Sequence, residues 1–206
     1  MTDLETKLHK IGLVPVVVLK TLEETKPTLE ALRNGGVPVA EICYRTDCAA
    51  DCLRLAAKEF PDMLIGAGTV INASQCAEAI ANGARFIVSP GLSDSVAAVC
   101  AKANIPYLPG IVTPTEIMHA IELGITTLKF FPAGVYGGLK AIKALSAAFP
   151  QCLFMPTGGV DNTNLKEFIS NNKIIACGGS WMVKGTPEDI KKTCREARQI
   201  VEEVRG

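Results

Sequence analysis

The chain has 206 residues, 48% of them hydrophobic and 20% charged, which predicts one domain spanning 1–206 whose core needs no metal or disulfide to fold. Its 21 basic and 21 acidic side chains cancel, which argues against nucleic acid or an anionic membrane as a partner. The longest apolar runs, such as Leu13–Leu19, are too short to cross a bilayer, and Met1–Lys10 lacks a signal-peptide core, so we expect a cytoplasmic protein.

Short runs rich in valine and isoleucine alternate with amphipathic stretches along the whole chain. This alternation is typical of β-α-β units that carry a parallel sheet. The eight predicted strands are, in chain order, Val14–Leu19, Val37–Cys43, Leu64–Ala67, Phe86–Ser89, Tyr107–Pro109, Thr127–Phe131, Leu153–Thr157 and Ile174–Gly178. The clearest predicted helices between and after them are Cys48–Glu59, Ala73–Asn82, Thr115–Leu123 and Pro187–Val204.

Helix boundaries and strand number together indicate the fold. Ser93 or Asp94 is expected to cap one helix, and Thr186 followed by Pro187 is expected to begin the last one. Eight parallel strands in so short a chain favour an α/β protein of the closed (β/α)8 TIM-barrel type, with a short N-terminal helix. The alternative is an open doubly wound sheet, which usually has roughly five or six strands.

The eight cysteines form no C-x-x-C pair, and we expect them to be reduced and mostly buried. Cys48 and Cys52 lie one helical turn apart, a spacing that two metal ligands can use. The two histidines, His9 and His119, are distant from them in the sequence. We therefore predict no metal and no cofactor.

Lys129 is the first candidate for chemistry, because it lies in the middle of the apolar strand Thr127–Phe131. Alternation along the strand puts it on the opposite face from Leu128 and Phe130. An ammonium is costly in an apolar interior, so burial would favour the neutral amine, a nucleophile toward carbonyl groups. The alternative is a lysine whose stem packs while its charge reaches solvent.

Glu41 and Arg45 lie at and just beyond the second predicted strand and share one face by the same alternation. In a barrel of this type, residues at the carboxyl ends of the strands form the active site. A partly buried carboxylate can transfer protons near neutral pH, and the planar guanidinium binds both oxygens of a substrate carboxylate. A structural ion pair at the rim is the alternative.

Glycines and hydroxyls follow three other strands. Gly66-Ala67-Gly68-Thr69 predicts a close approach of the backbone to a ligand, with Thr69 as a hydroxyl donor or, alternatively, as a helix cap. Thr157-Gly158-Gly159 and Gly178-Gly179-Ser180 end the last two predicted strands. Barrel enzymes often bind phosphate there, on backbone N–H groups; tight turns without a ligand are the alternative.

Motifs along nearly the whole chain resemble the 2-keto-3-deoxy-6-phosphogluconate and 4-hydroxy-2-oxoglutarate aldolase family. They are Pro15-Val16-Val17, Glu41 with Arg45-Thr46, Gly66-Ala67-Gly68-Thr69, Ser89-Pro90-Gly91, Leu108-Pro109-Gly110, Lys129-Phe130-Phe131-Pro132-Ala133, Pro156-Thr157-Gly158-Gly159 and Gly178-Gly179-Ser180-Trp181. Two stretches depart from the family pattern: Gly134–Gly138, where many members carry an acidic residue, and Cys43-Tyr44, often threonine and leucine. These departures bear on substrate choice.

The resemblance implies a class I aldolase, a carbon–carbon lyase of the Entner-Doudoroff pathway. Lys129 would form a Schiff base with the ketone, and Glu41 would move protons. The remaining roles that the resemblance implies are Arg45 and Thr69 for the carboxylate, Pro90, Phe131 and Thr157 as further substrate contacts, and Gly158, Gly159, Gly179 and Ser180 for phosphate. The products would be pyruvate and glyceraldehyde 3-phosphate, or pyruvate and glyoxylate from 4-hydroxy-2-oxoglutarate. A homotrimer is also implied by resemblance.

Three alternatives remain open from the sequence. The chain could act on the galactonate isomer of the sugar acid, since nothing in the sequence reveals the stereochemistry at C4. A phosphosugar isomerase or epimerase would use Glu41 as base and would leave Lys129 without a covalent task. A non-catalytic barrel would bind a phosphorylated metabolite without converting it.

Overall fold

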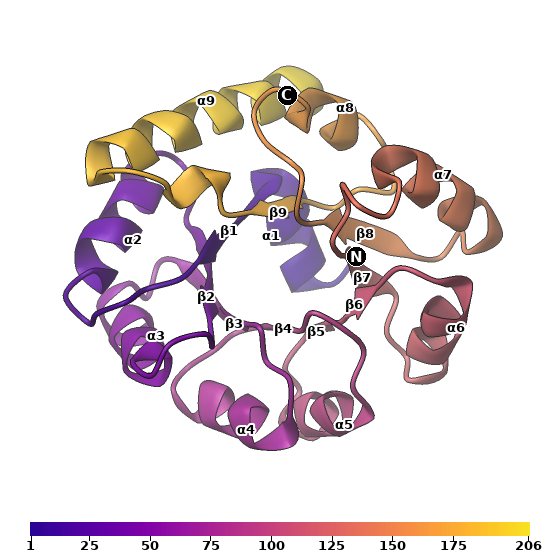
Figure 1. Ribbon diagram of the computed structural model, residues 1–206, viewed down its shortest axis with the longest axis horizontal. Helices are drawn as coiled ribbons and strands as arrows, with labels where there is room; N and C mark the ends of the chain where they lie inside the picture. The colour runs from indigo at the N-terminus through magenta and orange to yellow at the C-terminus, as the bar shows by residue number, and fades with distance from the viewer.

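Helices surround a set of parallel strands in the computed structural model, which describes all 206 residues (Figure 1). The strands are β1 (Leu13–Val17), β2 (Val39–Cys43), β3 (Leu64–Gly68), β4 (Ile87–Val88), β5 (Tyr107–Leu108), β6 (Gly110–Ile111), β7 (Thr127–Phe130), β8 (Leu153–Pro156) and β9 (Cys177–Gly179). The helices are α1 (Asp3–Ile11), α2 (Thr25–Asn34), α3 (Ala49–Glu59), α4 (Ala73–Ala81), α5 (Asp94–Ala103), α6 (Pro114–Glu122), α7 (Gly138–Ala148), α8 (Leu165–Ile169) and α9 (Pro187–Arg205), with a 3-10 turn, η1 (Trp181–Val183), before α9.

The strands form a curled parallel arrangement in two hydrogen-bonded sheets. One sheet has the order β5-β4-β3-β2-β1-β9, and the other has the order β6-β7-β8. The predicted α/β class and the order of strands and helices are therefore confirmed. Because the strands are parallel, their carboxyl ends lie at the same edge, where Arg45, Thr69 and the two glycine pairs are found.

Most observed strands differ from the predicted ones by one or two residues at an end, and three differ more. The fifth, Tyr107–Pro109, is shortened to Tyr107–Leu108, and a separate strand that was not predicted, β6, follows Pro109, which has no N–H with which to continue the ladder. The fourth is shortened to Ile87–Val88. The eighth begins at Cys177 rather than Ile174, because Ile174 forms only an isolated bridge, to Phe154.

Two apolar clusters lie on the two sides of the strands. The larger one, of 46 buried residues, joins the outer side of the strands to the helices. The smaller one, of 11 residues, lies among the strands and includes Val39, Phe86 and Met155 together with Leu4 and Leu8 of α1. Figure 1 shows α1 behind the strands and inside the ring of helices, so this predicted N-terminal helix fills the end opposite the loops.

Local signals place the helix ends as expected. Ser93, rather than Asp94, caps α5 by accepting a hydrogen bond from the Val96 N–H, and Thr186 caps α9, whose first turn holds Pro187. Arg205, near the end of α9, donates to the carbonyl oxygens of His9 and Ile175 at 2.6 and 2.9 Å. The last helix is thereby tied to α1 and to the segment before β9.

All eight cysteines are free and seven are buried, as predicted. None of the helices combines the length and the apolar composition needed to traverse a lipid bilayer.

Candidate active site

Lys129 lies in β7 with only 2% of its side chain exposed. Its neighbours Leu128 and Phe130 belong to the outer apolar cluster, which confirms that the lysine faces the other way, among the strands. Its Nζ is 3.4 Å from Glu41 Oε1 and 5.0 Å from the centre of the Phe131 ring. The amine is therefore held between one carboxylate and one aromatic face, away from bulk water.

Glu41 is fully buried and projects from the middle of β2. One of its oxygens, Oε1, pairs with Lys129, whereas the other, Oε2, is buried without a hydrogen-bond partner in the protein. Buried carboxylate oxygens are seldom left unpartnered, because the loss of hydration is costly. The protein itself therefore leaves Oε2 unpaired, on the same carboxylate that contacts the Lys129 amine.

Gly68, at the end of β3, provides the space for this carboxylate. A β-carbon at Gly68 would lie 2.2 Å from Glu41 Oε1, and one at Gly66 would lie 2.4 Å from the Phe86 ring. Both glycines make room for side chains of neighbouring strands. The structure thus gives both glycines a packing role, and the close approach of this backbone to a ligand stays a prediction.

Cys43 ends β2 beside the carboxylate, with its Sγ 4.0 Å from Glu41 Oε1. Burial, reinforced by the nearby negative charge of Glu41, raises the pKa of the Cys43 thiol to about 12. The thiol therefore stays neutral at physiological pH. A neutral thiol is a weak donor toward Glu41 and adds no second negative charge to the site.

Arg45 and Thr69 lie together at the loop edge. The Arg45 Nε donates to Thr69 Oγ1 at 2.8 Å, while the guanidinium remains exposed. Thr69 has a φ of 56°, an unfavourable conformation for a β-branched residue. The helix after it is capped by Asn72, so the capping alternative for Thr69 is excluded.

A pocket of about 340 Å³ opens above the amine. It brings together most of the predicted site residues: Arg45, Lys129, Phe131, Thr157, Gly158, Gly159, Gly179 and Ser180. Three predicted site residues, Glu41, Thr69 and Pro90, do not line this pocket. Pro90 is exposed, and its carbonyl packs against Gly110, where a β-carbon would lie 2.1 Å away.

The two pairs of positions at the pocket require glycine for different structural reasons. Gly158 and Gly159 have φ values of 82° and 84°, which side chains rarely adopt. Gly178 and Gly179 have ordinary backbone angles and instead leave room for Thr157 Oγ1 and the Trp181 ring. The N–H groups of Gly158, Gly159 and Ser180 donate no hydrogen bond within the protein, so they are free to bind an anion.

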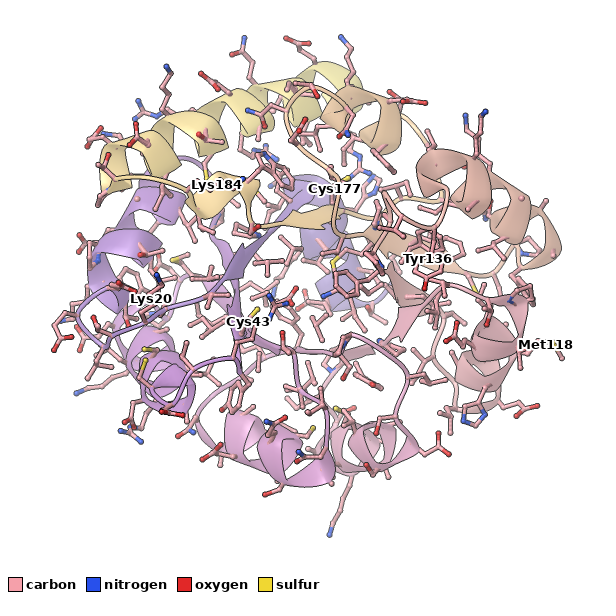
Figure 2. All side chains as sticks on the ribbon, viewed as in Figure 1. Lys20, Cys43, Met118, Tyr136, Cys177 and Lys184 are labelled. Atoms are coloured by element: carbon pink, nitrogen blue, oxygen red, sulfur yellow. The ribbon has the colours of Figure 1, made fainter.

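Five further residues line the pocket and were not predicted: Val16, Val160, Asp161, Trp181 and Lys184. Asp161 and Lys184 lie shortly after the two glycine pairs, in the loops that follow β8 and β9. Their position after the carboxyl ends of these strands is the signal that could have identified them from the sequence. Figure 2 labels Lys184 beside η1, on the inner side of α9.

Comparison with known proteins gives a consistent result. The sequence model described as "KDPG and KHG aldolase" matches residues 4–195. The KHG/KDPG aldolase of Escherichia coli K12 is 41% identical over 202 residues, which cover 95% of each chain.

Two similar solved structures were captured with small molecules. The Legionella pneumophila KDPG aldolase, described with pyruvate as a covalent carbinolamine intermediate, has a TM-score of 0.86 and 38% identity over 98% of each chain. The Zymomonas mobilis 2-keto-3-deoxy-6-phosphogluconate aldolase, described with 3-phosphoglycerate, has a TM-score of 0.90 and 34% identity over 95% of each chain.

Proposed function

The chain belongs to the KDPG and KHG aldolase family, and on this premise we propose that it cleaves 2-keto-3-deoxy-6-phosphogluconate to pyruvate and glyceraldehyde 3-phosphate. The chain is an aldolase, a carbon–carbon lyase. We propose 4-hydroxy-2-oxoglutarate, which yields pyruvate and glyoxylate, as a second substrate. The observation that carries the proposal is the buried Lys129 amine beside the buried Glu41 carboxylate, 3.4 Å apart.

Lys129 is the proposed nucleophile. Its ammonium passes a proton to Glu41, and the neutral amine adds to the C2 ketone to give a carbinolamine. Glu41 then returns the proton to the departing hydroxyl, so that loss of water leaves an iminium ion. The carbinolamine described for the Legionella relative is the first of these species. The iminium nitrogen then accepts the electron pair of the breaking C3–C4 bond, which leaves an enamine on C2 and C3.

Glu41 is the proposed base and acid. As the C3–C4 bond breaks, the proton of the C4 hydroxyl passes to Glu41, directly or through one water, and the aldehyde leaves. Glu41 then returns that proton to C3 of the enamine, and water hydrolyses the resulting iminium to release pyruvate and restore the Lys129 ammonium beside Glu41. The unpartnered Oε2 supports this role, because it is the oxygen that Lys129 does not occupy. The proposed steps use no metal or cofactor.

The remaining residues would hold the substrate at its two ends. Arg45, fixed by Thr69, would bind the carboxylate next to the ketone, and Phe131 and Thr157 would line the middle. The free N–H groups of Gly158, Gly159 and Ser180, with Gly179 beside them, would bind the phosphate. Fixing both ends brings the carbonyl within reach of the amine. Pro90 lies outside the pocket, and its proposed contact with the substrate rests on the family resemblance.

The finer architecture and assembly are also proposals. A closed (β/α)8 barrel, folded as one domain, is supported by the bridges Phe154 to Ile174 and Thr157 to Gly178, which connect the edges of the two sheets. At the other edges, β5 and β6 are separated only by Pro109. A homotrimer would cover exposed apolar side chains such as Ile71 and Val135, and light scattering would test it. A cytoplasmic location stays a prediction.

Borohydride reduction in the presence of pyruvate tests the proposed chemistry. Reduction of the iminium would leave a stable pyruvate-derived mass on the peptide that contains Lys129, with loss of activity. The Lys129→Met variant should give neither adduct nor turnover, whereas Lys102→Met, at an exposed lysine of α5, should give both. Absence of an adduct from the native enzyme would contradict a Schiff-base mechanism and favour an isomerase. Tight binding of the sugar acid without pyruvate release would favour a non-catalytic protein.

A further inference from the structure

The positively charged side chains of the pocket differ in whether another group of the protein binds them. Lys129 is paired with Glu41, and the Arg45 Nε is bound to Thr69. Lys184 is exposed, lines the same pocket, and takes part in none of the ion pairs of the structure. It is therefore the one pocket cation without a fixed protein partner.

Asp161 is the only carboxylate that lines this pocket. It accepts hydrogen bonds from the Thr163 N–H at 2.8 Å and from the Thr163 hydroxyl at 2.5 Å. These hydrogen bonds hold the pKa of Asp161 below its usual value, and the one from the Thr163 hydroxyl has the largest effect. The positive charge of Lys184 acts in the same direction. Asp161 is consequently ionised at neutral pH and repels an anion bound nearby.

The loops that carry Asp161 and Lys184 are tied together. The Trp181 Nε1 donates to Asn162 Oδ1 at 2.8 Å, which joins the loop after β8 to η1. Gly179 makes room for this indole ring. The bond fixes the two loops next to one another, beside the free N–H groups of Gly158, Gly159 and Ser180.

From these relationships we propose that Lys184 determines the preference of the enzyme for a phosphorylated substrate, by pairing with the phosphate and offsetting Asp161. The inference rests on the proposed function. The backbone N–H groups are neutral donors, which a hydroxyl or a water can also occupy. A phosphate dianion is stabilised further by a nearby cation. Without Lys184, the only charged pocket residue in the loops after β8 and β9 would be Asp161, which is negative.

The test compares two substrates that differ only in the phosphate: 2-keto-3-deoxy-6-phosphogluconate and 2-keto-3-deoxygluconate. Lys184→Gln should lower kcat/KM for the phosphorylated acid roughly tenfold, which corresponds to about 1.4 kcal/mol, mainly through KM. Cleavage of the unphosphorylated acid should be unchanged. Lys184→Arg should retain the preference, since it keeps the charge, and Lys102→Gln is the control at an unpaired exposed lysine outside the pocket.

Asp161 provides the reciprocal variant. Asp161→Asn should raise kcat/KM for the phosphorylated acid and leave the other substrate unaffected. Inorganic phosphate should compete with the unphosphorylated acid in the native enzyme, and more weakly in Lys184→Gln. Added salt should reduce the difference between native enzyme and Lys184→Gln, because it screens exposed charges.

The outcomes separate this inference from the proposed function. If the native enzyme releases pyruvate and its substrate preference is the same in Lys184→Gln, the role of Lys184 is refuted while the aldolase assignment stands. An equal loss for both substrates would also refute it, since the lysine would then contact a part that both substrates share. If the native enzyme cleaves neither acid, the proposed function itself fails.

Discussion

Gly68 and the carboxylate of Glu41 occupy adjacent positions that leave no room for one more carbon atom. A β-carbon at Gly68 would lie 2.2 Å from Glu41 Oε1, well inside van der Waals contact. The position of the proposed proton-transfer group is thus set by the absence of a side chain on the neighbouring strand.

Gly68→Ala should therefore displace the carboxylate and lower kcat. A shift of about 1 Å in a reacting group typically costs roughly 100-fold in rate. Steady-state assay of pyruvate release measures this, and borohydride trapping should still label Lys129, because the amine itself is not moved. Gly91→Ala is the matched control, since a β-carbon there would meet nothing within 4 Å and its φ is not positive. Similar losses in both variants would contradict the steric explanation.

The Lys129 and Glu41 pair should show strong coupling in stability. Removal of one partner from a buried ion pair commonly costs about 3–5 kcal/mol, because an unpaired charge is left behind. We expect Lys129→Met and Glu41→Gln each to lower the free energy of unfolding by about 3 kcal/mol, and the double variant to lose less than the sum. Urea unfolding of the four proteins gives the coupling energy. Additive losses would mean that the two groups do not depend on one another.

Thr69 positions Arg45 through its hydroxyl, although its own backbone conformation is strained. A left-handed conformation costs about 1–2 kcal/mol for a residue with a side chain, so Thr69→Gly should not reduce the free energy of unfolding. The same variant loses the hydroxyl that fixes Arg45. KM should rise roughly tenfold, because one charge-assisted hydrogen bond that positions Arg45 is lost. Thr69→Ser keeps the hydroxyl and should keep KM near its native value. A large loss of stability in Thr69→Gly would contradict the strain.

Buried thiols should make the protein sensitive to alkali. Burial raises the pKa of Cys194 from 9.0 to about 12. A thiol that is neutral when folded and ionises when unfolded stabilises the fold fully below pH 9, and this contribution is lost as the pH rises toward 12. The free energy of unfolding should fall over this interval by about 1.4 kcal/mol per pH unit for each such thiol.

Cys194→Ala isolates one of these contributions. The variant has its own cost from lost packing, but its slope against pH above 9 should be less steep than that of the native protein by one proton. Urea unfolding at several values between pH 8 and pH 11 supplies the slope. Identical slopes would show that Cys194 ionises equally well in the folded state.

Much of the fold followed from local pattern. Alternation with a period of two identified the face of Lys129, because successive side chains of a strand point in opposite directions wherever the strand lies. Capping residues such as Ser93 and Thr186 marked helix ends, since a cap acts on backbone groups only a few residues away. The short strand Gly110–Ile111 after Pro109 was missed, although the end of the fifth predicted strand lay at that proline.

What only the tertiary structure decided is which groups meet. Lys129 and Glu41 are 88 residues apart in the sequence, and nothing near either one specifies a distance of 3.4 Å between them. Neighbouring strands and loops likewise decide that Gly68 makes room for Glu41. They also decide that Trp181 bonds to Asn162 and that Asp161 and Lys184 line the same pocket. The physical reason is range: propensity, capping and alternation act over a few residues, whereas a reactive site is made by contacts between segments that the whole fold brings together.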